Sequence, residues 1–287
     1  MLTKKFAVFI LTHGRPNNII TLQTLKNAGY TGKVYLVIDN EDPTADEYFN
    51  KYGKEMVIQF DKKKAAKKFD EADTFDNRKA IVYARNESFR IAEDLGLDYF
   101  LQLDDDYTAF LYRWPDGSVL RSTPIRSFDK VCEIMLDFLE DTNALTVAFS
   151  QGGDHIGGIG GHWLEGLLRK AMNSFFVRVN RPINFIGRLN EDVNAYALYG
   201  SRGEIFLTTM DLQLTQVQTQ KSSGGMTETY LDAGTYVKSF YTVMMAPSSV
   251  HIRAMGVSNQ RLHHRIDWTT TYPKIISSKF QKPRAKE

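Results

Sequence analysis

The sequence predicts an α/β protein with a mixed, mostly parallel sheet between layers of helices. Three short apolar runs, Phe6–Leu11, Lys33–Ile38 and Tyr99–Leu103, have the length and unbroken hydrophobicity of strands buried on both faces. Polar loops and helical patterns follow the first two runs, and such strand–loop–helix units imply right-handed crossovers and a parallel sheet. The carboxyl ends of parallel strands share one edge, where ligands bind, so functional side chains are expected there.

The composition is that of an ordinary globular chain. Its 287 residues, 43% of them hydrophobic, can bury a sizeable core as one large domain or two small ones. The single cysteine, Cys132, excludes an intramolecular disulfide and fits a reducing compartment. No segment approaches the roughly 18–20 apolar residues that cross a bilayer. We therefore expect a soluble cytoplasmic protein that does not contact a membrane.

Three consecutive carboxylates, Asp104, Asp105 and Asp106, end the third apolar run. Adjacent acids repel one another unless a cation or hydrogen-bond donors neutralise them. Carboxylate oxygens suit Mg²⁺ or Mn²⁺, ions that usually share their coordination with substrate phosphates. Taken alone, the motif is equally consistent with an acidic turn in solvent.

The loops after the first two runs carry further candidates. Phe6–Leu11 is followed by Thr12-His13-Gly14-Arg15, and a helix is predicted over Ile19–Asn27, ended by Gly29. Arg15 could pair with a diphosphate, and Asp39, after the second run, could hold a ribose or a base donor group. The alternative for Arg15 is a surface charge, and the alternative for Asp39 is a residue that only forms a turn.

The segment before the acidic strand is predicted to contain a short strand, a lysine-rich stretch and a helix. The strand is Glu55–Phe60, and the helix runs from Asn77 to Leu95 and includes Arg85-Asn86. The stretch Asp61–Asp73 between them has the composition of a solvated, mobile face.

This order of elements resembles the GT-A class of nucleotide-sugar glycosyltransferases. The Asp-x-Asp motif of that class corresponds to Asp104 and Asp106. The resemblance implies a single GT-A domain over residues 1–287. Its Rossmann-like nucleotide-binding half would be residues 1–110, with Mn²⁺ or Mg²⁺ bridging the donor diphosphate. The contacts it implies for the nucleotide sugar are Thr12, Arg15, Asp39, Arg85, Asn86, Asp104 and Asp105.

The second half, residues 111–260, is expected to bind the acceptor. A helix over Phe128–Glu140 and a strand over Ala144–Ser150 lead into a glycine-rich stretch, residues 151–163. Its six glycines predict a loop that lets backbone approach a ligand or lets a lid move. His155, His162 and Trp163 are candidate acceptor or sugar contacts. A flexible connector around a buried tryptophan is the alternative.

A second acidic pair follows the strand predicted over Ser174–Val179. Glu191 and Asp192 stand at a predicted helix start and resemble the pair that holds the catalytic base of inverting GT-A enzymes. The resemblance assigns Asp192 as the base that accepts the acceptor hydroxyl's proton, with Glu191 beside it. Two acids that merely complement a helix dipole are the alternative.

The remaining elements are a strand, a loop, a helix and a strand. They are predicted over Glu204–Gln216, Gln220–Thr227, Leu231–Met245 and Ser249–Met255. In several GT-A families a late histidine completes the metal shell. The candidate here is His251, with His263-His264 as the rival.

The chain from residue 251 onward is basic. Lys and Arg far outnumber the acids there, and Trp268 and Tyr272 are interleaved with them, a composition that suits nucleic acid. Lys274 and Lys279, in the predicted basic tail over residues 261–287, are candidate acceptor contacts. A solvated tail is the alternative.

Three segments also resemble the TET-associated glycosyltransferases of bacteriophages: Leu189–Asn194, Gly224–Val250 and Trp268–Phe280. This resemblance implies transfer of a sugar from a UDP-sugar to 5-hydroxymethylcytosine, or a related 5-hydroxymethylpyrimidine, in double-stranded phage DNA within the host cytoplasm. Alternatives are a glycan, lipid or protein acceptor, a nucleotidyltransferase that makes nucleotide sugars, and a DNA-binding protein without catalysis.

Overall fold

The computed structural model describes residues 4–73, 78–161, 163, 174–217, 237–255 and 261–271. Its main strands are β1 Phe6–Leu11, β2 Lys33–Asp39, β3 Val57–Phe60, β4 Tyr99–Asp104, β5 Tyr107–Asp116, β6 Val119–Pro124, β7 Thr146–Gln151, β8 Ser174–Arg178 and β9 Phe206–Gln216. The helices are α1 Ile20–Asn27, α2 Ala45–Tyr52, α3 Lys62–Ala66, α4 Val82–Asp94, α5 Phe128–Thr142, α7 Glu191–Ser201, α9 Val237–Met245 and α10 Trp268–Thr271.

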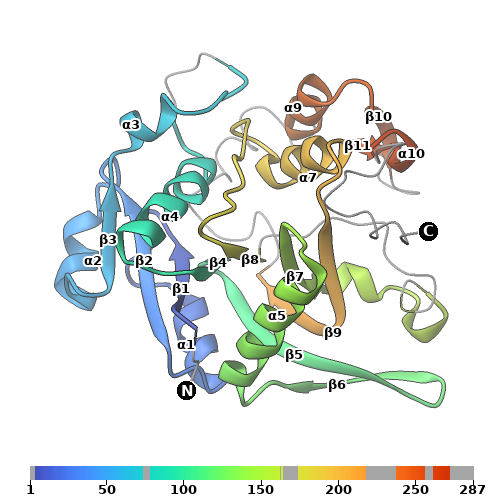
Figure 1. The fold of residues 1–287 in the computed structure, drawn as a ribbon, viewed down its shortest axis with the longest axis horizontal. Helices are drawn as coiled ribbons and strands as arrows, with labels where there is room; N and C mark the ends of the chain where they lie inside the picture. The colour runs from blue at the N-terminus through green and yellow to red at the C-terminus, as the bar shows by residue number, and fades with distance from the viewer. Residues whose placement is uncertain are drawn as a thin grey trace, which may run out of the picture.

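The main strands form one sheet in the order β3-β2-β1-β4-β8-β7-β9-β5-β6. Its first four strands are parallel, as are β7 and β9, and the remaining neighbours pair antiparallel. Helices cover both faces of this sheet (Figure 1). The predicted α/β class, with a mixed sheet flanked by helices, is confirmed.

Strand β1 shows why the sheet has two hydrophobic faces. All six of its residues are buried, and successive side chains point to opposite sides. Phe6, Val8 and Ile10 join the core under α1, α2 and α5. Ala7, Phe9 and Leu11 join the core under α3, α4 and α7. An unbroken apolar run is therefore required where helices lie on both faces.

The acidic triplet forms the turn between β4 and a hairpin made by β5 and β6. This hairpin was not predicted, because Pro115 and a mixture of polar and aromatic residues obscure its alternation. Pro115 is accommodated beside the edge strand β6, opposite Leu120. Figure 1 shows the two strands extending together as a long ribbon along the lower side of the view.

A small second sheet completes the described part of the chain. Strands β10 (Val250–Met255) and β11 (Arg261–Ile266) pair antiparallel and pack with α9, while α10 packs on α7. These late elements lie together in Figure 1, beside α7. The predicted loop over residues 220–227, the start of the helix predicted from residue 231 and the tail from residue 272 lie outside the described residues.

The glycine-rich stretch is more regular than predicted. Two short 3-10 turns occupy it, η1 over Gly152–His155 and η2 over Gly158–Gly160. Gly157 has a φ of +87°, and a Cβ on Gly161 would lie 2.2 Å from the carbonyl oxygen of Ile156. Glycine is needed here because the chain folds back closely on itself.

In the described part of the chain, none of the helices is long and apolar enough to span a membrane.

We predict that Gly29→Ala destabilises the protein more than Gly96→Ala. Both glycines have positive φ, which costs an L-residue about 1–2 kcal/mol, and at Gly96 nothing else opposes a Cβ. At Gly29 the Cβ would also lie 2.3 Å from the carbonyl oxygen of Arg126, which is backbone. Urea unfolding of both variants measures the difference, and equal losses would contradict this packing.

Candidate functional site

The carboxyl ends of β1, β2 and β4 meet at one edge of the sheet. Leu11 is paired with Asp104 in the β1–β4 register, and Asp39 ends β2 on the other side of β1. Strand β7 also runs parallel to β4, because β8 pairs antiparallel with both. The loops that carry Thr12, Asp39, Asp105 and Gln151 therefore open at the same edge.

The loop after β1 holds Asp105. Thr12 Oγ1 donates to Asp105 Oδ2 at 2.7 Å, and Arg15 Nη1 donates to Asp105 Oδ1 at 3.0 Å. The Tyr48 hydroxyl joins this group, 2.9 Å from Thr12 Oγ1 and accepting from the Arg15 backbone N–H. Burial raises the pKa of Asp105, and Arg15 and Thr12 offset part of that rise. Asp105 thus anchors the loop to the acidic turn.

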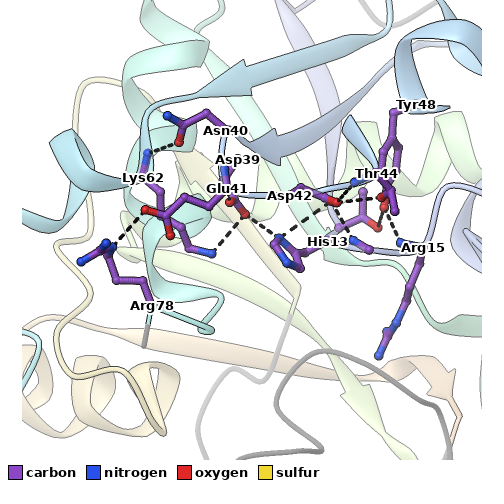
Figure 2. Close-up of polar contacts among 12 residues, drawn as sticks. His13, Arg15, Asp39, Asn40, Glu41, Asp42, Thr44, Tyr48, Lys62 and Arg78 are labelled. Carbon is purple, nitrogen blue, oxygen red and sulfur yellow. Dashed lines mark hydrogen bonds and ion pairs between the residues drawn. The ribbon is translucent and has the colours of Figure 1, made fainter. Parts of the chain in front are cut away.

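Asp39 lies at the centre of a second polar cluster (Figure 2). His13 Nδ1 is 2.8 Å and Lys62 Nζ is 3.2 Å from Asp39 Oδ2, while the Glu41 N–H donates to Oδ1 at 3.0 Å. Burial favours a higher pKa for Asp39, but the hydrogen bond from His13 and the charge of Lys62 outweigh it and lower the pKa. Asp39 is therefore an ionised carboxylate that is stabilised by hydrogen bonds and a lysine of the protein instead of by water.

The prediction of a solvated lysine-rich face over Asp61–Asp73 is wrong at its first lysine, Lys62. Lys62 is only 4% exposed and lies over the Tyr83 ring, with Nζ 5.5 Å from the ring centroid. The Asp61 side chain accepts the Lys64 N–H and starts α3, which turns Lys62 inward toward Asp39. Lys62 thus forms a buried ion pair with Asp39, which the lysine-rich composition gave no reason to expect.

Burial and mutual repulsion shape the acidic turn. Burial raises the pKa of Asp104 to about 7 against the opposing charge of Arg85, and Asp106, Glu191 and Asp105 raise it further. Burial and the Asp105 charge raise the pKa of Asp106 to about 6. Both carboxylates would gain from a cation, which is the environment that favours metal binding.

Arg85 occupies the interior rather than the surface of this edge. It is 1% exposed, its Nη2 donates to Asp104 Oδ1 at 3.1 Å, and its Nε donates to Glu191 Oε1 at 2.8 Å. The guanidinium also lies 5.1 Å from the Phe175 ring centroid. The predicted nucleotide contact is thus an arginine that links the acidic turn to the start of α7.

Glu191 and Asp192 form the first turn of α7, as predicted. Each is 7% exposed, and Asp192 Oδ1 accepts the Val193 N–H at 2.8 Å. Burial raises the pKa of Glu191, Arg85 opposes this rise, and the Asp192 charge adds to it. Glu191 is committed to Arg85, whereas Asp192 is not part of that ion pair.

Asn86 bonds to backbone, and His251 is on a strand of the second sheet. The Asn86 side chain accepts the Phe185 N–H and donates to the Phe185 carbonyl, both at 2.9 Å, so it clamps backbone. His251 is exposed on β10, where it pairs with Arg265. The rival His264 has its Nδ1 3.3 Å from Asn190 Nδ2, immediately before the acidic pair of α7. Their roles in nucleotide or metal binding stay predictions.

The acceptor candidates are only partly described. His155 is buried in η1, with Nε2 2.9 Å from Ser150 Oγ, and its ring lies 6.3 Å from that of Trp163. His162, Lys274 and Lys279 lie outside the described residues.

Four residues of the two clusters were missed by the sequence analysis: His13, Asp42, Tyr48 and Lys62. Asp42 accepts the Gly14 N–H at 2.7 Å and so joins the loops after β1 and β2. His13 and Asp42 belong to the polar runs that end two predicted strands, a signal sufficient to include them. Tyr48 and Lys62 lie on helices, and the sequence pattern offers no such signal for them.

Comparison with known families identifies the chain. A mixed α/β sheet with acids after β4 and a second acidic pair at a helix start is the arrangement expected of a nucleotide-sugar glycosyltransferase. The family model of the TET-associated glycosyltransferases matches residues 6–225, which is most of the chain. The protein therefore belongs to the TET-associated glycosyltransferase family and is a glycosyltransferase.

Solved glycosyltransferase structures share little sequence identity with this chain. Glucosyl-3-phosphoglycerate synthase from Mycobacterium tuberculosis, solved with Mn²⁺, UDP and phosphoglyceric acid, matches with 9% identity and a TM-score of 0.44, over 92% of this chain and 87% of that one. TarS from S. aureus matches with 12% identity and a TM-score of 0.45, over 84% and 65%. The mannosyltransferase PcManGT from Pyrobaculum calidifontis, solved with GDP-Man and Mn²⁺, matches with 12% identity and a TM-score of 0.43, over 85% and 73%. No curated protein sequence gave a match.

We predict that Asp39→Asn destabilises the protein by about 3–5 kcal/mol at pH 7, because Lys62 is left buried without its counter-charge. The folded-state pKa of Asp39 lies below its ordinary value of 3.8. Its contribution is thus present above that value and is lost as the pH falls through the folded pKa. Urea unfolding from pH 7 to pH 3 should show the gap between wild type and variant closing only on the acid side.

The double variant Asp39→Asn/Lys62→Met is the matched control. Removing both charges leaves no buried ion unpaired, so much of the lost stability should return. A double variant no more stable than Asp39→Asn would contradict the ion pair.

Proposed function

We propose that the enzyme transfers a sugar from a UDP-sugar to the hydroxyl of 5-hydroxymethylcytosine, or a related 5-hydroxymethylpyrimidine, in double-stranded DNA. The observation that carries this proposal is the pair of acidic groups at one sheet edge, Asp104–Asp106 and Glu191–Asp192, connected through Arg85. One group suits a donor diphosphate with its metal ion. The other supplies a carboxylate for proton transfer.

The donor side is formed by the loops after β1, β2 and β4. Arg15 lies beside the acidic turn, where a diphosphate would need positive charge. The Asp39 cluster lies farther along the same edge, on β2, at the position suited to the nucleoside. Thr12 and Asp105 support this loop from within.

The acidic turn fits Mn²⁺ or Mg²⁺. In the described parts of the chain, no group of three or more His, Cys, Asp and Glu side chains is arranged to hold a metal ion. This suits ions that one or two carboxylates share with substrate phosphates, and Asp104 and Asp106 would be those carboxylates. When bound, the ion would stabilise the departing diphosphate as a Lewis acid. Asp105 is already engaged by Thr12 and Arg15.

Asp192 is assigned as the base of an inverting reaction. Glu191 is held by Arg85, so proton acceptance falls to its neighbour at the start of α7. The reaction would form the bond from the acceptor oxygen to the anomeric carbon, break the bond to the diphosphate and pass the hydroxyl proton to Asp192.

The DNA acceptor is supported by membership of the TET-associated family and by the basic late segment of the sequence. A set of UDP-sugars with Mn²⁺ and a duplex containing 5-hydroxymethylcytosine tests it, with nucleoside mass spectrometry of the digested DNA. A hexosyl or pentosyl adduct on the modified base is expected. Binding of donor with no adduct on any hydroxymethylated DNA would overturn the DNA acceptor and favour a glycan, lipid or protein.

We predict that Asp106→Ala abolishes turnover and metal-dependent donor binding while the protein still folds. Burial and the Asp105 charge both disfavour the ionised Asp106 carboxylate, so its removal should relieve repulsion and leave the fold intact. Calorimetric titration with UDP and Mn²⁺ measures the loss. Asp94→Ala, at an exposed ion pair of α4, is the control and should behave like wild type. Near-normal activity of Asp106→Ala, or full activity in EDTA, would show that the metal assignment is wrong.

We predict that Asp192→Asn lowers kcat by at least about 100-fold with little change in donor affinity. The amide keeps the size and the oxygen that accepts the Val193 N–H, but it cannot take a proton. Steady-state kinetics with saturating donor measures this effect. Intact kcat with weakened donor binding would move Asp192 from catalysis to binding.

A further inference from the structure

At the carboxyl end of β7, two neutral side chains have a buried polar atom without a hydrogen-bond partner among the described residues. They are Nδ1 of His155 and Nε2 of Gln151. Buried polar atoms are nearly always satisfied in a folded protein, so each exception calls for an explanation. Both belong to one short segment, in which Gln151 ends β7 and His155 ends η1, at the same sheet edge as the acidic turn.

The hydrogen bonds around His155 determine which of its nitrogens carries the proton. Ser150 Oγ has one hydrogen, which it donates to the Leu212 carbonyl at 2.8 Å. His155 Nε2, 2.9 Å from that oxygen, must then be the donor. Burial and the charge of Arg113 lower the pKa of His155, which keeps the ring neutral. Nδ1 is consequently a buried acceptor that lacks a donor.

Gln151 has a buried donor, Nε2, that lacks an acceptor. Its side-chain oxygen accepts the Asp154 N–H in a capping box, and the Asp154 carboxylate accepts the Gln151 N–H at 2.9 Å. The amide is therefore oriented, and its NH₂ group is a buried donor without an acceptor. One acceptor and one donor, both neutral, are thus fixed in the same turn.

The position of this turn favours a contact with the sugar-accepting substrate over one with the nucleotide sugar. Gln151 is in register with Leu214 of β9, and β9 leads to Val217, whose N–H donates to the Asp106 carbonyl at 3.2 Å. The turn lies on the far side of the acidic turn from β1 and β2, which carry the proposed nucleotide loops. Trp163 contributes an aromatic ring near His155.

We propose that His155 Nδ1 and Gln151 Nε2 bind the edge of the pyrimidine that receives the sugar. This inference rests on the proposed function and assigns its base-reading groups. Cytosine presents an amino N–H donor beside the N3 acceptor, which complements the His155 acceptor and the Gln151 donor. That edge is paired in a duplex, so the nucleotide must leave the stack to reach the turn.

Two substitutions of His155 separate base reading from structure. In His155→Gln the amide nitrogen takes the place of Nε2 and keeps the bond to Ser150, but the Nδ1 acceptor is lost. In His155→Asn the amide oxygen takes the place of Nδ1, but the bond to Ser150 is lost. Gln151→Glu keeps the oxygen that caps η1 and removes the donor.

The probe is a duplex with a single 5-hydroxymethylcytosine, used with the UDP-sugar that the wild-type enzyme accepts. His155→Gln and Gln151→Glu should raise KM for this DNA about 10- to 100-fold, the effect of leaving a buried hydrogen-bonding group unpaired. The affinity of both variants for the UDP-sugar should stay within about twofold of the wild-type value. His155→Asn should lose thermal stability yet keep a KM closer to that of wild type.

A second probe tests the hydrogen-bond pattern. In 5-hydroxymethyluracil a carbonyl replaces the amino group, so wild type should prefer the cytosine duplex and His155→Gln should lose that preference. An unchanged KM in His155→Gln and Gln151→Glu would overturn the inference. So would weaker donor binding in both, which would assign the turn to the donor's sugar. A wild type that glycosylates no DNA would instead refute the proposed function.

Discussion

The ion pairs of the buried Arg85 guanidinium hold together the sheet edge that carries the candidate site. It lies between two carboxylates from distant parts of the chain, Asp104 after β4 and Glu191 at the start of α7. Removing Arg85 would leave both carboxylates buried without their counter-charge, which is far more costly than removing the whole group. The sheet edge and α7 are therefore fixed relative to each other by charge as well as by packing, and the proposed metal-binding and proton-accepting groups are positioned together.

Local hydrophobic patterns predicted most of the fold. Strand β1 has the predicted bounds, and β2, α1 and α5 differ by one or two residues, because apolar runs and glycine stops depend on nearby sequence. The β5–β6 hairpin was missed, since Pro115 is tolerated only because the pairing of β5 with β9 ends earlier, at Tyr112. Placement of β9 between β7 and β5 also depends on contacts that no local pattern contains.

The candidate site was predictable where its residues end strands and unpredictable where partners are distant in sequence. The acids of the β4 turn stand at a strand end and those of α7 at a helix start, and both positions follow from local sequence patterns. Lys62 was expected in solvent because its partner Asp39 is 23 residues away. Arg85 was expected at the nucleotide from the family resemblance, and its ion pair with Glu191, 106 residues later, could not be foreseen. Resemblance to a family indicated the residue but not its contacts.

The strand order has a consequence for how the protein is made. The first four strands can pair by residue 104, but the outer edge of β4 waits for β8, and the inner edge of β5 waits for β9. Such late, non-local pairing is slow, and an apolar strand with an open edge is prone to associate with other chains. During synthesis the hydrophobic β4 is thus exposed until about seventy further residues have emerged, counted from Asp104 to the start of β8 at Ser174. The helices on both faces of β4 then shield its surfaces, but only β8 closes its edge.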